Sequence, residues 1–244
     1  MEHFWSFFAF PLNLLLALLW LVSWGMLWKN RPESKLVRWL LSPPATIASI
    51  SFLILAGLWI GFSGKRDYVL SIPFILILLF VQTVVWLITI RGFRRNGKIR
   101  WRFLLIHLGF LLALGAAFWG SPDSSELRVK LVRGQETRTA YKMDGSVTPL
   151  DFAIRMDDYK MTLSDDGKPS YYEAIVAIDD AAPEVITVNH PYSVRLGEDV
   201  YLAGVSEGGC VLQIVREPWR YLVLVGILML LAGAFMLFVN GPKR

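Results

Sequence analysis

The chain has 244 residues, of which 55% are hydrophobic and only 18% charged, with a mean hydropathy of +0.47. Soluble domains carry about 25% charged residues, so the composition excludes a disordered chain and argues against an ordinary soluble enzyme. The net charge of +5 is unevenly distributed, because residues 121–218 hold 10 Lys/Arg and 17 Asp/Glu. The basic residues elsewhere lie beside hydrophobic runs, so they indicate membrane topology and exclude nucleic acid as a partner.

Five apolar runs are long enough to cross a lipid bilayer as helices, which takes about 20 residues each. Charged residues occur only next to their ends. We predict a transmembrane region over residues 1–120 and a fifth transmembrane helix after an external domain at 121–218, followed by a cytoplasmic tail at 240–244. The predicted spans cover residues 4–28, 43–62, 68–90, 101–119 and 219–239.

Short basic segments follow the first and third runs, and such segments stay in the cytoplasm. The N-terminus and residues 121–218 are therefore expected outside, with the C-terminus in the cytoplasm. The first run is expected to be a retained helix, because its basic residues follow it instead of preceding it as in a signal peptide. Small residues are expected to let helices pack closely; they are Gly57 with Gly61, and Gly109 with Ala113 and Ala117.

From Leu127 onward the hydrophobic pattern changes to period two, which is typical of strands. Runs rich in β-branched residues, separated by turns that contain glycine, indicate further strands. The predicted fold class is an integral membrane α-helical bundle of five spans, with an external all-β, sandwich-like domain inserted between spans 4 and 5. The expected strand cores are residues 127–131, 152–156, 174–178, 185–188, 200–205 and 211–215.

Motifs of independent catalysis are absent: the chain has no nucleophile elbow, zinc motif, phosphate-binding loop or dinucleotide fingerprint. Cys210 is the only cysteine, which excludes an intrachain disulfide, and we expect a buried, inert thiol. Adjacent carboxylates are expected in solvated turns and strand faces; they are Asp157-Asp158, Asp165-Asp166 and Asp179-Asp180.

His107 is the one titratable side chain within the apolar part of a span. At 1.5 Å per residue it lies roughly 9 Å from the cytoplasmic end of its helix. Neutral imidazole can ligate iron without bringing a charge into lipid, whereas the alternative role is an interhelical hydrogen bond with Gln82 on the third span. His190 lies in an extended segment that turns at Pro191, and it is a minor candidate.

Two stretches resemble the ResB/CcsB family of System II cytochrome c maturation. They are Phe103-Leu-Leu-Ile-His-Leu-Gly-Phe110 leading to Gly115, and Val188-Asn-His-Pro-Tyr192 followed by Gly197, Tyr201 and Glu217-Pro218. With the topology, the resemblance covers the chain from about residue 44.

The resemblance implies a subunit of the bacterial inner (cytoplasmic) membrane that assists haem transfer across the bilayer and delivery to apocytochrome c. Its partner would be a CcsA/ResC-type membrane protein with a tryptophan-rich WWD segment, which this chain lacks. His107 would be a transmembrane axial ligand of the iron of haem b, held transiently and shared with that partner. The chain would then be no enzyme by itself, but an accessory subunit of a membrane cytochrome c haem lyase (synthase) complex. The alternative function is a structural or sensory membrane protein whose external β domain binds a protein or ligand.

Overall fold

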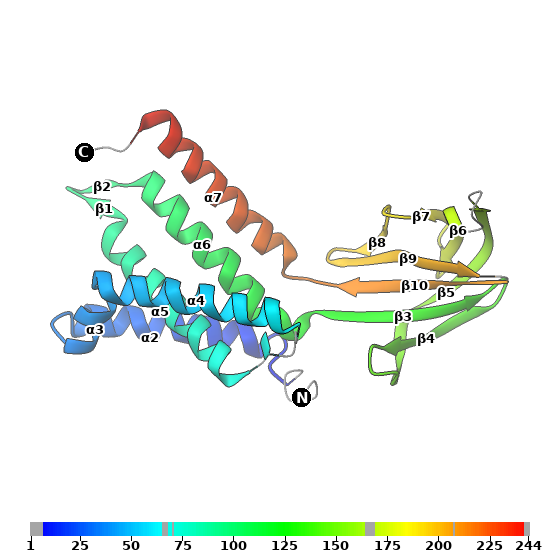
Figure 1. The fold of residues 1–244 in the computed structure, drawn as a ribbon, viewed down its shortest axis with the longest axis horizontal. Helices are drawn as coiled ribbons and strands as arrows, with labels where there is room; N and C mark the ends of the chain where they lie inside the picture. The colour runs from blue at the N-terminus through cyan, green and yellow to red at the C-terminus, as the bar shows by residue number, and fades with distance from the viewer. Residues whose placement is uncertain (1–6, 65–67, 70, 164–168, 207, 242–244) are drawn as a thin grey trace. The chain divides into compact units, whose positions relative to one another are not determined.

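The computed structural model describes residues 7–64, 68, 69, 71–163, 169–206 and 208–241. The chain forms two compact units (Figure 1). The helical unit comprises residues 1–122 and 219–244, and the β unit comprises residues 123–218.

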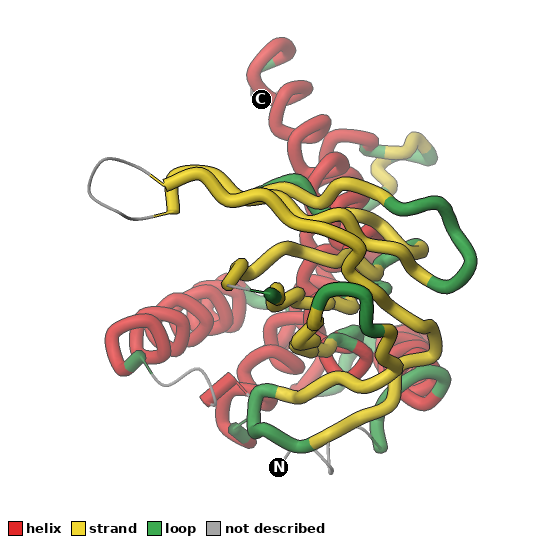
Figure 2. Tube along the Cα trace, turned by 90° about the vertical axis from the view of Figure 1, so that its right-hand side faces the viewer, coloured by secondary structure: helices red, strands yellow, loops and turns green. Residues whose placement is uncertain are grey.

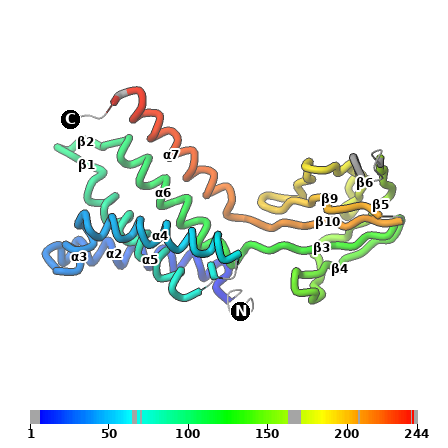
Figure 3. Tube along the Cα trace, viewed as in Figure 1, coloured from blue at the N-terminus to red at the C-terminus, as the bar shows by residue number. Residues whose placement is uncertain are grey.

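The helical unit contains five helices long and apolar enough to cross a membrane, as the sequence predicted. They are α2 (Leu12–Asn30), α4 (Pro43–Ser63), α5 (Ile72–Gly92), α6 (Trp101–Trp119) and α7 (Arg220–Asn240). Figure 3 follows these helices in chain order. A short helix, α3 (Lys35–Leu40), and a 3-10 turn, η2 (Ser121–Asp123), lie between them in the sequence.

The first helix begins later than predicted, at Leu12 and not at Phe4. Proline has no amide hydrogen to donate to a preceding turn, and the cap at Pro11 marks the start of the helix. Residues 7–11 form turns, whereas residues 4–6 of the predicted span lie outside the described residues. The other four spans agree with the prediction to within about four residues.

The basic segment before α6 is not a plain loop, because β1 (Arg94–Arg95) pairs with β2 (Lys98–Ile99). Asn96 and Gly97 make the turn with φ values of 51° and 74°, as the two-residue turns of tight hairpins require. The α3 helix likewise lies in a segment that the sequence indicated only as basic. Ser34 caps α3 by accepting a hydrogen bond from the Val37 amide, as short helices commonly need.

Helix α5 is the central helix of the unit, and it contacts α2, α3, α4 and α6. Two tryptophans join it to α2: Trp86 donates to the Leu21 carbonyl at 2.9 Å, and Trp20 donates to Thr83 Oγ1 at 3.2 Å. Polar groups that find partners between helices stabilise packing where lipid offers none.

Helices α6 and α7 make the closest helix contact, through glycine. A Cβ on Gly226 would lie 2.5 Å from the Ala113 nitrogen and 2.7 Å from the Gly109 oxygen. The expected packing role of Gly109 and Ala113 is therefore confirmed. The expectation for Gly57 and Gly61 is wrong for the part of the chain that the structure describes. A Cβ built at either glycine has no atom of another helix within 4 Å.

The β unit is one antiparallel sheet of eight strands in the order β7-β6-β5-β4-β3-β10-β9-β8. The strands are β3 (Ser125–Val132), β4 (Glu136–Lys142), β5 (Val147–Leu163), β6 (Pro169–Ile178), β7 (Glu184–Thr187), β8 (Tyr192–Arg195), β9 (Glu198–Ser206) and β10 (Gly209–Arg216). The predicted all-β unit is thus confirmed, but its strands join in one sheet and not in a two-sheet sandwich. Strand β4 escaped prediction because only Ala140 of its seven residues is buried.

The sheet curls so that its two edges approach each other around one hydrophobic core, as the curved strands in Figure 2 show. Strands β6 and β7, at one edge of the sheet, contact β9, which lies next to the opposite edge. A bridge between Thr187 and His190 lies in the turn that joins the two edge strands, β7 and β8. A bulge at Asp157, where β5 shifts register against β6, adds the bend that a long strand needs to curl. The core includes Val129, Ile154 and Leu212, which are fully buried.

Four charged side chains form a closed ring at one end of the sheet. Glu198 accepts from Arg195 Nε and Arg216 Nε, both at 2.5 Å. Asp151 completes the ring through the terminal nitrogens of the same two arginines, at 2.6 and 2.8 Å. Glu198 is buried, so its charge depends on both arginines for compensation. The ring ties the β8–β9 turn to β5 and to the last residue of β10.

The close contact of α6 with α7 makes Gly226 intolerant of larger residues. Gly226→Val should lower the stability of the protein in detergent by about 1–3 kcal/mol, because the side chain meets backbone atoms that cannot move aside. Thermal unfolding followed by tryptophan fluorescence measures the change. Gly57→Val adds the same side chain to a helix where no described atom lies within 4 Å; an equal loss in both variants would contradict the packing role.

The buried carboxylate makes the ring sensitive to substitution. Glu198→Ala should destabilise the β unit by about 3 kcal/mol, because it leaves two arginines without their buried partner. Hydrogen exchange of β8–β10 in the full-length protein is the measurement, with Asp180→Asn, at an exposed turn residue, as the control.

A weaker, pH-dependent loss is expected at Asp151. Although burial acts to raise the pKa of Asp151, the hydrogen bond from Arg195 and the charges of both arginines hold it below its usual value. A lowered pKa stabilises the fold at neutral pH, and this contribution should disappear as the pH falls below about 4. Protection factors in β8–β10, which are corrected for the intrinsic pH dependence of amide exchange, should therefore fall on acidification, and Asp151→Asn should reduce that fall.

Candidate functional site

His107 lies on α6, six residues after the helix begins, and its side chain is half-buried. Its Nδ1 lies 2.9 Å from the carbonyl oxygen of Phe103, one turn earlier. A carbonyl can only accept, so Nδ1 carries the proton and donates it. Nε2 then carries the lone pair, which is the state in which imidazole binds a metal. The local helix therefore sets the tautomer that a ligand requires.

An aromatic ring and a cation lie next to the imidazole. The Phe103 ring stacks on His107 with 3.9 Å between ring centroids and an interplanar angle of 24°. The guanidinium of Arg100 lies 4.7 Å from the Phe103 centroid and donates to the Gly92 carbonyl at 3.1 Å. Spacings of three and four residues place Arg100, Phe103 and His107 on one helix face.

Gly92, at the end of α5, makes room for this cluster. A Cβ there would lie 2.5 Å from the tip of the Phe103 ring, so any larger residue would displace the ring on which His107 stacks. The sequence indicated His107 as a candidate ligand, but it did not indicate a role for Phe103, Arg100 or Gly92 beside it. The spacing of four residues from His107 along one helix could have indicated Phe103. The contact of Phe103 with Gly92 joins two different helices, so helical spacing does not indicate it.

The predicted alternative of a hydrogen bond between His107 and Gln82 is wrong. Gln82 Oε1 accepts from Trp119 Nε1 at 3.0 Å, and its amide nitrogen has no hydrogen-bond partner among the described residues. Gln82 lies beside Gly115, where a Cβ would be 3.7 Å from its Oε1. Gly115 is eight residues beyond His107, or about 12 Å along the helix, so the two side chains lie at different depths.

A cavity of about 410 Å³ lies at this other end of the helical unit. Its lining is almost wholly apolar and comes from α2, α4, α5 and α6, with Leu78 and Phe118 among the lining residues. Asn13 is the buried amide at its wall and donates to the Trp119 carbonyl at 2.8 Å. None of the described residues that line the cavity is charged, so this lining suits an apolar group.

The remaining candidates belong to the β unit. His190 is exposed in the turn between β7 and β8, where its amide donates to the Thr187 carbonyl at 3.2 Å. Cys210 is buried in β10, as expected, and burial raises its pKa to about 11. Asp179 accepts from the Ala153 amide at 2.7 Å in a turn; the predicted pair Asp165-Asp166 lies outside the described residues. The described residues contain no group of three potential metal-binding side chains, so His107 stays a single donor.

Comparisons with known proteins bear on α6 and most of the β unit. Residues 94–211, just under half of the chain, match the model of the ResB-like family. No curated protein sequence matches the chain. Among solved structures, the cytochrome c haem lyase CcmF is similar with a TM-score of 0.44 and 13% identity, over 93% of this chain and 45% of that one. The chain thus spans less than half the length of that lyase. The family match includes His107 and His190.

Proposed function

We propose that the protein is a membrane subunit of cytochrome c maturation that assists haem transfer across the bilayer and its delivery to apocytochrome c. One observation carries the proposal: His107, inside an apolar helix, has its Nδ1 proton engaged by the Phe103 carbonyl, which leaves Nε2 available as an axial ligand. The match of residues 94–211 to the ResB-like family supports the same process.

The surroundings of His107 suit an anionic macrocycle. Phe103 stacks on the imidazole and so helps to hold the orientation of the ring. Arg100 lies at the end of the helix, about 10 Å before His107 along the axis, where a cation can meet carboxylates at the level of the lipid headgroups. Haem, when bound, supplies iron with open axial positions; the chain supplies one oriented nitrogen and a cation.

A single axial donor implies a site shared with a second protein. The described residues offer no second histidine within the helical unit, and haem iron in electron-transfer proteins commonly takes two axial ligands. We propose that a CcsA/ResC-type membrane protein supplies the other ligand. In this assignment residues 121–218 face the outside of a bacterial inner membrane, because the basic segments flank the opposite ends of the helices.

Haem retention tests the proposed ligand. His107→Ala, coexpressed with the CcsA/ResC-type partner, should lose most of the co-purified haem and at least tenfold of the holocytochrome yield. Adding imidazole should restore part of the Soret absorption, because it replaces the lost donor. Leu108→Ala removes a neighbouring half-buried side chain and serves as the control. Unchanged haem content in His107→Ala contradicts the assignment and favours a structural or sensory protein.

Charge offers a second test. Residues 121–218 carry an excess of seven negative charges, which should attract a basic apocytochrome over distances that salt screens. Replacing exposed carboxylates by Glu136→Gln, Asp180→Asn and Glu184→Gln together should slow association several-fold at low salt and flatten its salt dependence. Lys130→Gln makes the unit more acidic and should have the opposite effect. Stopped-flow association rates distinguish the two; equal salt slopes for all variants contradict electrostatic steering.

A further inference from the structure

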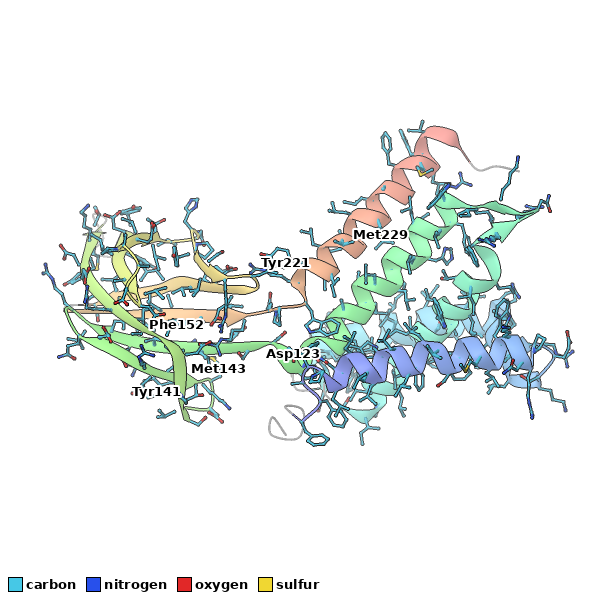
Figure 4. The ribbon with its side chains drawn as sticks, turned by 180° about the vertical axis from the view of Figure 1, so that it is seen from behind. Asp123, Tyr141, Met143, Phe152, Tyr221 and Met229 are labelled. Atoms are coloured by element: carbon cyan, nitrogen blue, oxygen red, sulfur yellow. The ribbon has the colours of Figure 1, made fainter. Side chains whose placement is uncertain are left out.

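The most exposed large apolar side chains of the β unit gather at one end of its sheet. Among its described residues, Leu196 is 77% exposed, Val147 65% and Met143 59%. Single exposed apolar residues are normal on a protein surface, but here the three highest values fall on two turns. Figure 4 shows Met143 at the tip of the β4–β5 hairpin, beside Tyr141.

Strand register places both turns at the same end. Lys142, which precedes the β4–β5 hairpin tip, is paired with Leu127 near the start of β3. Glu198, which follows the β8–β9 turn, is paired with Arg216 at the end of β10. Arg216 is itself paired with Ser125, the first residue of β3. The two apolar turns therefore share the end of the sheet at which β3 begins and β10 finishes.

The chain joins this same end to helices long enough to span a membrane. Helix α6 ends at residue 119 and helix α7 begins at residue 220. Only a few residues therefore separate each helix from the paired ends of β3 and β10. The β8–β9 turn lies against the connection to α7: a Cβ on Gly197 would be 2.7 Å from Pro218 Cα, and the Glu217 amide donates to the Gly197 carbonyl at 2.7 Å. Leu196 is thus held beside the last residues before the helix.

Local charges do not oppose contact with lipid at Leu196. Its neighbour Arg195 is paired with Asp151 and Glu198, and Arg216 is paired with the same two carboxylates. The ring formed by these four residues has no net charge. Lys142 and Asp144 flank Met143, and charged side chains with apolar neighbours are compatible with the headgroup level of a bilayer.

We propose that the β8–β9 turn and the β4–β5 hairpin tip enter the interfacial layer of the lipid bilayer, with Leu196, Met143 and Val147 as the inserted side chains. The occupant of this surface is phospholipid, because the end that carries it continues directly into the candidate spans. The inference rests on α6 and α7 crossing the membrane, but not on any role in haem transfer.

Depth-dependent fluorescence quenching tests this contact. Leu196→Cys and Met143→Cys, each labelled with bimane, are placed as full-length protein in phosphatidylcholine nanodiscs that contain nitroxide-labelled lipids. Cys210 stays unlabelled because it is buried and its pKa is about 11; the unsubstituted protein serves as the blank. Val132→Cys, 53% exposed at the opposite end of β3, is the matched negative control, and Leu231→Cys, 61% exposed on α7, reports the membrane interior.

The proposal expects quenching of at least twofold at positions 196 and 143 by nitroxides near the headgroups, none at 132, and strong quenching at 231 by nitroxides deep in the acyl chains. Fluorescence at 196 and 143 equal to that at 132, with quenching at 231 intact, overturns lipid contact while the spans stand. Loss of quenching at 231 as well overturns the spans and the contact together. Shielding at 196 that appears only after a partner protein is added assigns the surface to protein and also overturns the proposal.

Discussion

The backbone contact between α6 and α7 is the constraint on which the arrangement of the chain depends. Gly226 and Gly109 bring the two helices so close that a single added carbon would meet backbone atoms. The chain leaves α6 into β3 and returns from β10 into α7, and β3 and β10 are themselves paired from Ser125 with Arg216 onward. Each connection thus joins one of two adjacent helices to one of two adjacent strands. A folded sheet can therefore be inserted between the two helices without a long linker.

Within the helical unit, polar chemistry is concentrated at few positions. Trp20, Trp86 and Trp119 donate to carbonyl or side-chain oxygens on neighbouring helices, as in Trp86 to Leu21. His107 instead donates to its own helix at Phe103. An intrahelical bond uses one nitrogen and leaves the other for a ligand, whereas an interhelical bond would have consumed the donor for packing. This difference is the physical basis for the proposal that His107 binds a ligand.

The β unit solves a different problem, since it is acidic overall but must end against the residues that lead into an apolar helix. Its ring of Arg195, Arg216, Asp151 and Glu198 is neutral as a whole and lies beside Leu196, although exposed carboxylates such as Asp144 and Glu217 occur at the same end. The four ring charges compensate one another, which makes the β8–β9 turn compatible with the proposed contact with lipid.

Hydrophobic length and charge in the sequence determined the five apolar helices, the all-β character of residues 121–218 and the selection of His107, because these depend on local composition and period. Only the tertiary structure decided that the strands form a single curled sheet, since sheet closure depends on which edges meet and on the bulge at Asp157. It also decided that Gln82 bonds Trp119 and not His107, because relative depth depends on how α5 packs on α6. The ion-pair ring likewise brings Asp151 to Arg195 and Arg216, which lie far from it in the chain, and no spacing in the sequence indicates this pairing.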